Sequence, residues 1–254
     1  MLYWIITFTL LGGILSALAA SVFLLVPAPG RTRVLPHLVS FATGALLGAA
    51  FLALLPRAFV GADADNVGLT VLAGLLAFFM LEKAVLWRHC HHDECEAHGP
   101  GDKQRDAASG VLVLVGDGIH NLLDGVLIAA AFLTDFHLGV VTSVAVVAHE
   151  IPQEVGDLAV LLNAGFTRRR AFIINVLASL ASVLGGVVAY FWLERTQELL
   201  PFVLAVAAAS FVYVAVADLI PGLHRRVDGR ASLFQILLIG GGVGVIYLTR
   251  LALH

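Results

Sequence analysis

Apolar residues gather in long runs along this chain, and short polar joints separate the runs. Eight runs can be drawn, at about residues 3–26, 36–59, 67–87, 109–133, 137–163, 170–193, 200–221 and 232–251. Each run is long enough to cross about 30 Å of hydrocarbon as an α-helix. Proline, glycine, aspartate and arginine mark the joints, as at 27–30 and 61–65. The pattern predicts an all-α integral membrane protein with eight transmembrane helices.

The composition agrees with that pattern. The 254 residues are 59% hydrophobic and 13% charged, with a mean hydropathy of +0.94, whereas soluble domains are about 45–50% apolar and about 25% charged. We therefore expect a single transmembrane domain over residues 1–254, surrounded by the lipid bilayer. No nucleic acid is expected among its partners.

Lysine and arginine predict the orientation, because they concentrate in the cytoplasmic loops of membrane proteins. The loops after the first, third, fifth and seventh runs carry eleven of them: Arg31, Arg33, Arg88, Lys103, Arg105, Arg168, Arg169, Arg170, Arg225, Arg226 and Arg230. The opposite side carries three: Arg57, Arg195 and Arg250. We expect a multi-pass protein of the cell membrane, with both termini extracytoplasmic and the loop 88–108 in the cytosol.

Two runs share a short sequence echo. The second run contains Phe51-Leu-Ala-Leu-Leu-Pro56, and the seventh contains Val216-Ala-Asp-Leu-Ile-Pro221. The two runs cross in opposite directions, as the halves of an inverted repeat do, with three spans on each side of a central pair. The alternative is coincidence, because apolar helices that end in Leu-Pro are common.

The fifth run carries a polar stretch, with His149, Glu150, Glu154 and Asp157 in an otherwise apolar segment. Ionisable groups at membrane depth are energetically unfavourable and usually face the bundle interior, where they serve function. Residues three and four apart share one helix face, which places His149 beside Gln153. Proline 152 removes one backbone hydrogen bond and opens room for an ion.

The fourth run repeats this logic with Asp117, His120, Asn121 and Asp124. His120 lies about 17 Å along its run and His149 about 18 Å along the next, at 1.5 Å per residue. The runs are antiparallel and joined by a short turn at 134–136, so both clusters should meet near the midplane. Imidazoles with carboxylates favour a divalent metal site; the alternative is a set of interior polar groups that satisfy one another. Three glycines leave room for a neighbouring helix: Gly116, Gly118 and Gly125.

Other polar positions lie outside these clusters. The loop after the third run is dense in potential zinc ligands, namely His89, Cys90, His91, His92, Cys95 and His98. Their spacing does not fit an ordered four-ligand finger, so they form either a transient metal-capturing loop or a solvated linker. Asp218 in the seventh run either lines an exit path or satisfies a helix contact.

His120-Asn-Leu-Leu-Asp-Gly125 and the stretch His149–Asp157 resemble the two signature motifs of the ZIP family of zinc and iron transporters. The match is closest to the LIV-1-like branch, whose second motif usually reads His-Glu-x-Pro-His-Glu-x-Gly-Asp. The stretches 79–83 and 210–221 agree as well. The resemblance implies a ZIP-like 3+2+3 bundle and a homodimer. It also implies an importer of Zn²⁺, with Cd²⁺, Fe²⁺ or Mn²⁺ as further substrates, in which spans 1, 4, 5 and 6 move against spans 2, 3, 7 and 8.

The resemblance also implies a binuclear site. Its primary position would use His120, Asp124, His149, Glu150 and Gln153, and its second position Asn121 with Asp124 and Glu150 shared. We also expect Glu154 among the metal-binding residues, and Glu154 and Asp157 would lead the ion to the inner exit. Asp117 and Asp218 would be accessory residues. The chain departs from the family pattern in three places. Gln153 replaces a histidine, Ser182 stands where one branch has a glutamate, and the second run lacks a polar side chain between Gly44 and Pro56.

A zinc-dependent intramembrane hydrolase is the competing class, because His149-Glu150 is similar to the start of a His-Glu-x-x-His motif. Leu123-Asp-Gly125 would supply a third ligand in that case. The position four residues after His149 is Gln153, however, and Pro152 interrupts the helix between the pair. We therefore expect a transporter and not an enzyme. The sequence contains no Gly-x-x-x-x-Gly-Lys-Ser/Thr motif for ATP.

Overall fold

The computed structural model describes residues 1–23, 25–89, 103–163, 165–224 and 229–252, and within these ranges every regular element is a helix. The elements are α1 (Leu2–Phe23), α2 (Ala28–Ala49), the π-helical turn η1 (Ala50–Leu54), α3 (Leu55–Gly61), α4 (Ala64–His89), α5 (Lys103–Thr134), α6 (Phe136–Asn163), α7 (Arg168–Ser179), α8 (Ala181–Leu193), the 3₁₀ turn η2 (Gln197–Leu199), α9 (Leu200–Tyr213), the π-helical turn η3 (Val214–Leu219), α10 (Ile220–Leu223) and α11 (Gly229–Ala252).

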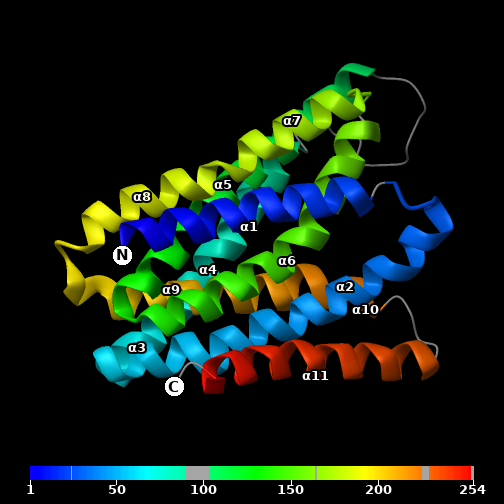
Figure 1. The fold of residues 1–254 in the computed structure, drawn as a ribbon. Coiled ribbons are helices and arrows are strands. Elements are labelled where there is room, and N and C mark those ends of the chain that lie inside the picture. The colour runs from blue at the N-terminus through cyan, green and yellow to red at the C-terminus, as the bar shows by residue number, and fades with distance from the viewer. Residues whose placement is uncertain (24, 90–102, 164, 225–228, 253–254) are drawn as a thin grey trace.

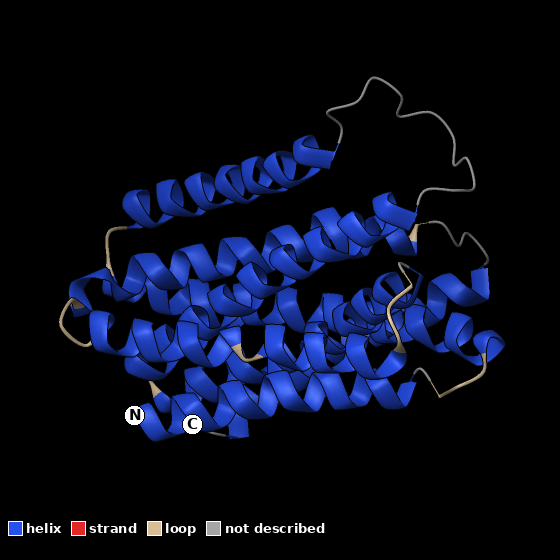
Figure 2. Cartoon of the chain, turned by 90° about the horizontal axis from the view of Figure 1, so that it is seen from above, coloured by secondary structure: helices blue, strands red, loops and turns tan. Residues whose placement is uncertain are grey.

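The helices run back and forth along one long axis (Figures 1 and 2). One end of the bundle holds the start of α1, the end of α11 and the connections near residues 62, 135 and 195. The other end holds the ends of α1 and α6 and the starts of α2, α7 and α11. Within the described ranges, seven helical segments are long and apolar enough to cross a membrane. The prediction of a multi-pass helical membrane protein is therefore confirmed. Helix α6 has 28 residues but is not among the seven, since it carries the polar stretch, and its crossing stays a prediction.

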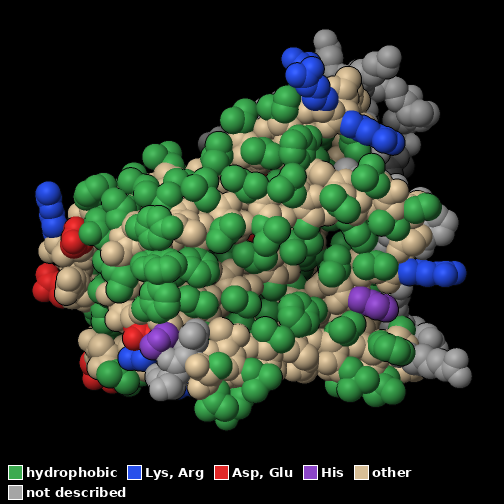
Figure 3. All heavy atoms as spheres, viewed as in Figure 1, with side chains coloured by type: hydrophobic (Ala, Val, Ile, Leu, Met, Phe, Trp, Pro, Cys, Tyr) green, Lys and Arg blue, Asp and Glu red, His purple; other side chains and the backbone are tan. Residues whose placement is uncertain are grey.

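The surface agrees with a lipid environment. Apolar side chains cover the long side of the bundle that Figure 3 shows, and most charged side chains lie toward its two ends. Large apolar residues are exposed on many helices, with Met80 at 68% and Ile236 at 66%. In each of the segments Ala64–Lys83 and Ala231–Ala252, only 11% of the most apolar 18-residue stretch is buried inside the structure. Helices α4 and α11 therefore form the outer faces of the bundle.

Glycines bring two pairs of helices into backbone contact. A Cβ atom on Gly125 of α5 would lie 1.8 Å from the backbone oxygen of Ser182, at the start of α8. The equivalent distance is 2.0 Å from Gly44 of α2 to the oxygen of Ile239 of α11. Small residues allow such close approach in membrane bundles. The prediction was wrong for Gly116 and Gly118, where an added Cβ would meet nothing within 4 Å in the part of the chain that the structure describes.

The contacts between helices divide the bundle into two groups. Helix α5 packs against α6 and α8, and α1 packs against α6 and α8. Helix α2 packs against α11, and α9 packs against α3 and α4. The main contact between the groups is that of α2 with α6. The grouping is the one expected from the family resemblance, with spans 1, 4, 5 and 6 on one side and 2, 3, 7 and 8 on the other.

The sequence echo between the second and seventh runs extends to the backbone. The turn η1 stands directly before α3, whose second residue is Pro56. The turn η3 stands directly before α10, whose second residue is Pro221. A proline lacks the N–H that an α-helix needs, and a π-helical turn changes the hydrogen-bond register at that point. The shared local structure favours a repeat over coincidence.

Candidate metal centre

Four ionisable side chains from α5 and α6 converge inside the bundle. His120 and Asp124 come from α5, and His149 and Glu150 come from α6. One ligand atom of each lies within 4.8 Å of the other three. Asp124 and Glu150 are 1% exposed and His149 is 2% exposed. The sequence prediction that the two clusters meet is therefore confirmed for these four residues.

A short corner between the two helices sets their register. Helix α5 ends at Thr134 and α6 begins at Phe136. The carboxylate of Asp135 accepts hydrogen bonds from the backbone N–H groups of His137 and Leu138, at 2.9 and 3.0 Å. These bonds satisfy two of the N–H groups that a helix start leaves free. The corner thus places His120 opposite His149.

The distances within the group have the size of a metal polyhedron. The Nε2 atoms of His120 and His149 are 3.2 Å apart, and His149 Nε2 is 3.2 Å from Asp124 Oδ2. Three further distances that join these nitrogens to carboxylate oxygens run from 3.6 to 3.9 Å. Zinc holds nitrogen and oxygen at about 2.0–2.2 Å, so the ligands of a tetrahedral site stand about 3.3–3.6 Å apart. The group fits a zinc-sized ion with little rearrangement.

The orientation of His149 follows from its second ring nitrogen. Nδ1 lies 3.1 Å from the backbone oxygen of Ala145. A carbonyl only accepts hydrogen bonds, so Nδ1 carries the proton and donates it to this bond. Nε2 then keeps its lone pair and points to His120 and Asp124. Ligand histidines in metal sites are held in this way by their second nitrogen.

Three of the four carboxylate oxygens in the group have no hydrogen-bond partner among the described residues. Both side-chain oxygens of Glu150 and the Oδ2 atom of Asp124 are buried without a hydrogen-bond partner. A buried carboxylate that is neither paired nor hydrogen-bonded is strongly unfavourable. A cation between these oxygens and the two imidazoles removes that penalty. Chemistry, geometry and burial therefore agree on a cation.

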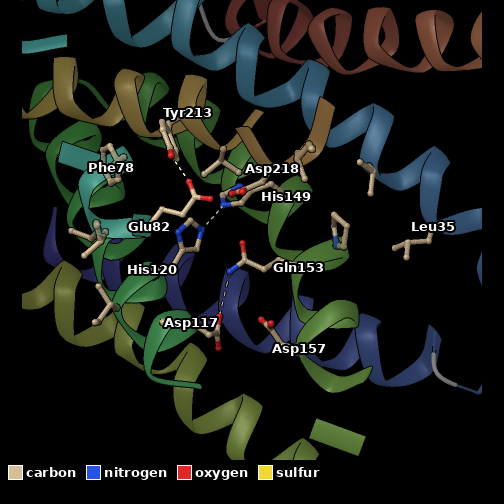
Figure 4. Close-up of a pocket in the computed structure, with 18 residues that line it drawn as sticks. Leu35, Phe78, Glu82, Asp117, His120, His149, Gln153, Asp157, Tyr213 and Asp218 are labelled. Carbon is tan, nitrogen blue, oxygen red and sulfur yellow. Dashed lines mark hydrogen bonds between the residues drawn. The ribbon is translucent and has the colours of Figure 1, made fainter. Parts of the chain in front are cut away.

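Two further residues predicted as ligands, Asn121 and Gln153, are tied to Asp117. The Nδ2 atom of Asn121 donates to Asp117 Oδ1 at 2.8 Å, and the Nε2 atom of Gln153 donates to the same oxygen at 3.4 Å. Both amide nitrogens thus face Asp117. Figure 4 shows Gln153 with its nitrogen toward Asp117 and its oxygen on the side of His120.

Glu154 does not join the four-residue group. Ser179 donates to its carboxylate at 2.7 Å, and Asn175 donates to its other oxygen. Both partners belong to α7, and Glu154 is fully buried. Its carboxylate therefore links α6 to α7 through hydrogen bonds. Sequence reasoning missed Asn175 and Ser179, although their spacing of four residues puts them on one helix face.

A cavity of about 490 Å³ reaches the two histidines (Figure 4). It is lined by His120, His149, Gln153 and four carboxylates, from Glu82, Asp117, Asp157 and Asp218. Tyr213 donates a hydrogen bond to Glu82 across the wall formed by α9 and α4. Sequence reasoning gave Glu82 no place near the site. The side chain of His89 and the residues Cys90, His91, His92, Cys95 and His98 lie outside the part of the structure that is described.

The opposite side of the site is filled with apolar side chains. The Phe211 ring lies 5.9 Å from the His149 ring, centroid to centroid. Leu127 and Ile128 follow Asp124 on α5, and Ala145 and Val146 precede His149 on α6; all four are buried. The path from the site to the end that holds both termini is therefore closed by packing. The cavity extends the other way, toward Asp157 and Asp218.

The fold and the site define a helical membrane protein with a buried histidine–carboxylate cluster. Residues 87–250 match the family model for the ZIP zinc transporters, and the chain belongs to the ZIP family. It is 35% identical to zinc transporter ZIP13 of Pongo abelii over 85% of this chain and 67% of that protein. It is 32% identical to ZIP13 of Homo sapiens, over 85% and 71%. Zinc transporter ZIP10 of Mus musculus is 36% identical over 58% of this chain and 19% of its own length. The intramembrane hydrolase finds no support in these relatives.

Proposed function

We propose that this protein carries Zn²⁺ across the membrane into the cytosol, and that His120, Asp124, His149 and Glu150 hold the ion on its way. The main support is the spacing of their four ligand atoms, 3.2–3.9 Å in the five distances that the structure gives. Two carboxylates offset the two charges of the ion, and two neutral imidazoles complete the site. Such a site can bind and release the ion without making or breaking a covalent bond in the protein, as a transporter requires.

The proposed direction rests on charge and on the cavity. The cavity extends from the two histidines toward Asp157 and Asp218, away from the end with both termini. Most lysine and arginine residues lie in the sequence near the other end. By the positive-inside rule this end is cytosolic, and both termini are extracytoplasmic. In this proposed orientation, the cavity leads from the site toward the cytosol, and packed side chains separate the site from the outside. We place the protein in the cell membrane, as one transmembrane domain.

The other residues predicted from the sequence have different proposed roles around the four ligands. Gln153 supplies an amide oxygen at the cytosolic side of the primary site, and Asn121 faces a second ion position that shares Asp124 and Glu150. Ser182 offers that position only a neutral hydroxyl, whose proton is donated to the backbone oxygen of Ser179 at 2.7 Å. Asp157 and Asp218 line the exit. Oxygen donors leave room for Mn²⁺, Fe²⁺ or Cd²⁺ as minor substrates. The outer faces of α4 and α11 offer the surface for a homodimer.

Zinc uptake into liposomes that contain the purified protein and an internal zinc dye tests this function. Wild-type protein should carry zinc much faster than empty liposomes. His149→Ala should lower the rate at least tenfold, because one ligand and its contact to Asp124 are lost. His37→Ala is the matched control, since His37 stacks on Phe234 outside the cavity, and it should leave the rate unchanged. A His149→Ala rate equal to that of wild type would refute the assignment.

A further inference from the structure

One carboxylate contacts both amide side chains beside the metal centre. Asp117 is 5% exposed, and its Oδ1 atom accepts from Asn121 at 2.8 Å and from Gln153 at 3.4 Å. Asn121 also donates to the backbone oxygen of Asp117, at 3.2 Å. The three side chains come from two helices, with Asp117 and Asn121 on α5 and Gln153 on α6. Asp117 and Gln153 both line the cavity that reaches His120.

The chemistry of an amide makes its orientation matter. The two ends of the group have nearly the same shape, but the oxygen accepts and the nitrogen only donates. A carboxylate only accepts, so it selects the amide nitrogen and turns the oxygen away from itself. An amide turned the other way would present N–H groups to a cation and repel it. The orientation of Gln153 therefore decides whether this residue is a ligand.

We propose that Asp117 is a positioning residue, which holds the amide of Gln153 so that its oxygen and not its nitrogen faces the ion. The same carboxylate fixes the amide of Asn121. This inference rests on the proposed function, because it gives Gln153 a role toward the transported ion. It also explains how the chain uses glutamine at this position. The ion meets an oriented oxygen donor, which suits harder divalent ions better than a third nitrogen would.

Two substitutions separate orientation from structure. Asp117→Asn keeps the size of the side chain but offers both a donor and an acceptor, so either orientation of Gln153 becomes possible. The zinc concentration for half-maximal uptake should rise about tenfold, the effect of losing a hydrogen bond to a charged group. Gln153→Ala removes the amide, so Asp117 has no group left to orient at this position. In the Gln153→Ala background, Asp117→Asn should change the half-maximal concentration less than about twofold, as a non-additive pair does.

Asp218→Asn is the matched control, because Asp218 is a carboxylate on another wall of the same cavity, in η3. It removes the same charge without touching either amide. Its effect should be the same in the wild-type and Gln153→Ala backgrounds. Elution of each detergent-solubilised variant as a single species checks that it is folded.

Each result has a defined meaning. A half-maximal zinc concentration that is unchanged by Asp117→Asn overturns the inference. An equal rise in both backgrounds assigns Asp117 a merely structural role and overturns it too. The inference is also overturned if the effect of Asp218→Asn on the half-maximal zinc concentration depends on residue 153 as strongly as the effect of Asp117→Asn does. Failure of the proposed function is distinguishable, because wild-type protein would then carry no zinc faster than empty liposomes.

Discussion

Gly125 offers a test of how packing supports the metal centre. It directly follows Asp124 on α5, and α8 crosses α5 at this point. A Cβ atom added here would lie 1.8 Å from the backbone oxygen of Ser182 and 2.8 Å from the backbone nitrogen of Gly186. These neighbours are main-chain atoms, so a change of side-chain rotamer cannot relieve the contact. Gly125→Ala must therefore move one helix relative to the other.

The size of that movement follows from the distances. Ordinary van der Waals contact begins at 3.4 Å, so the Ser182 oxygen must move by about 1.6 Å if it takes all the strain along the contact direction. Overpacking of a tight interior usually costs about 1–3 kcal/mol, occasionally more. At about 2–4 °C for each kcal/mol in a chain of this size, we expect the melting temperature to fall by several degrees. A shift of this size next to Asp124 also exceeds the spread of the ligand distances, 3.2–3.9 Å. Zinc affinity should therefore fall at least tenfold.

Thermal unfolding in detergent, with and without zinc, measures both effects. Gly118→Ala is the control on the same helix, because a Cβ atom there meets nothing within 4 Å. Alanine has the higher helix propensity, by about 0.5–1 kcal/mol in soluble helices, so this variant should be at least as stable as wild type. Equal melting temperatures for Gly125→Ala and Gly118→Ala would refute the argument that backbone contact between α5 and α8 holds Asp124 in place.

Two other predictions concern Glu154 and protons. Glu154→Gln places an NH₂ group beside the donors of Asn175 or Ser179, so the free energy of unfolding should fall by about 1–3 kcal/mol. The half-maximal zinc concentration in liposome uptake should stay within about twofold of the wild-type value. A tenfold rise would instead show that Glu154 is a ligand. Imidazole binds a metal only when it is deprotonated. Zinc affinity, measured by equilibrium binding to the purified protein, should therefore fall as the pH drops from about 7.5 to about 5.5, and a pH-independent affinity would contradict two histidine ligands.

The meeting of His120 and His149 could be predicted from the sequence, because it depends on few quantities. Helix rise fixes the depth of each residue, and a short corner fixes the register of two antiparallel helices. The distinction between Glu150 and Glu154 could not be predicted in this way. The two residues lie one turn apart on one face of α6, and only the position of α7 decides that Glu154 meets Ser179.

The same limit applies to the glycines and the amides. Gly118 and Gly125 are two turns apart on α5, yet only Gly125 meets a neighbouring backbone. The nitrogen of Gln153 faces Asp117 because α5 and α6 pack at one particular rotation. Local periodicity says which residues share a face, whereas rotation about the helix axis is set by contacts with distant elements. Interhelical packing therefore decides the parts of the site that the motifs leave open.

The charge of the site follows from its four members. Asp124 and Glu150 contribute two negative charges when ionised, and the imidazoles are neutral as ligands, so a bound Zn²⁺ makes the site neutral overall. Without a cation, two buried carboxylates stand close together, and three of their four oxygens have no hydrogen-bond partner among the described residues. A buried and unpaired charge is unfavourable in a membrane protein. The loaded site is therefore the form best suited to the low-polarity interior between α5 and α6.

Packing, and not charge, holds the far end of the site closed. The two helix groups meet there through Arg57 of α3 and Asp135, whose side chains are 4.0 Å apart and 41% and 29% exposed. An exposed ion pair of this kind contributes about 0–1 kcal/mol. A single apolar cluster also crosses the boundary, with Leu54 and Leu204 from one group and Phe132 from the other, all at most 1% exposed. Because lipid is itself apolar, close packing supplies most of the attraction between membrane helices. Opening this end therefore requires the two groups to part along packed side chains, and loss of the Arg57–Asp135 pair alone leaves it closed.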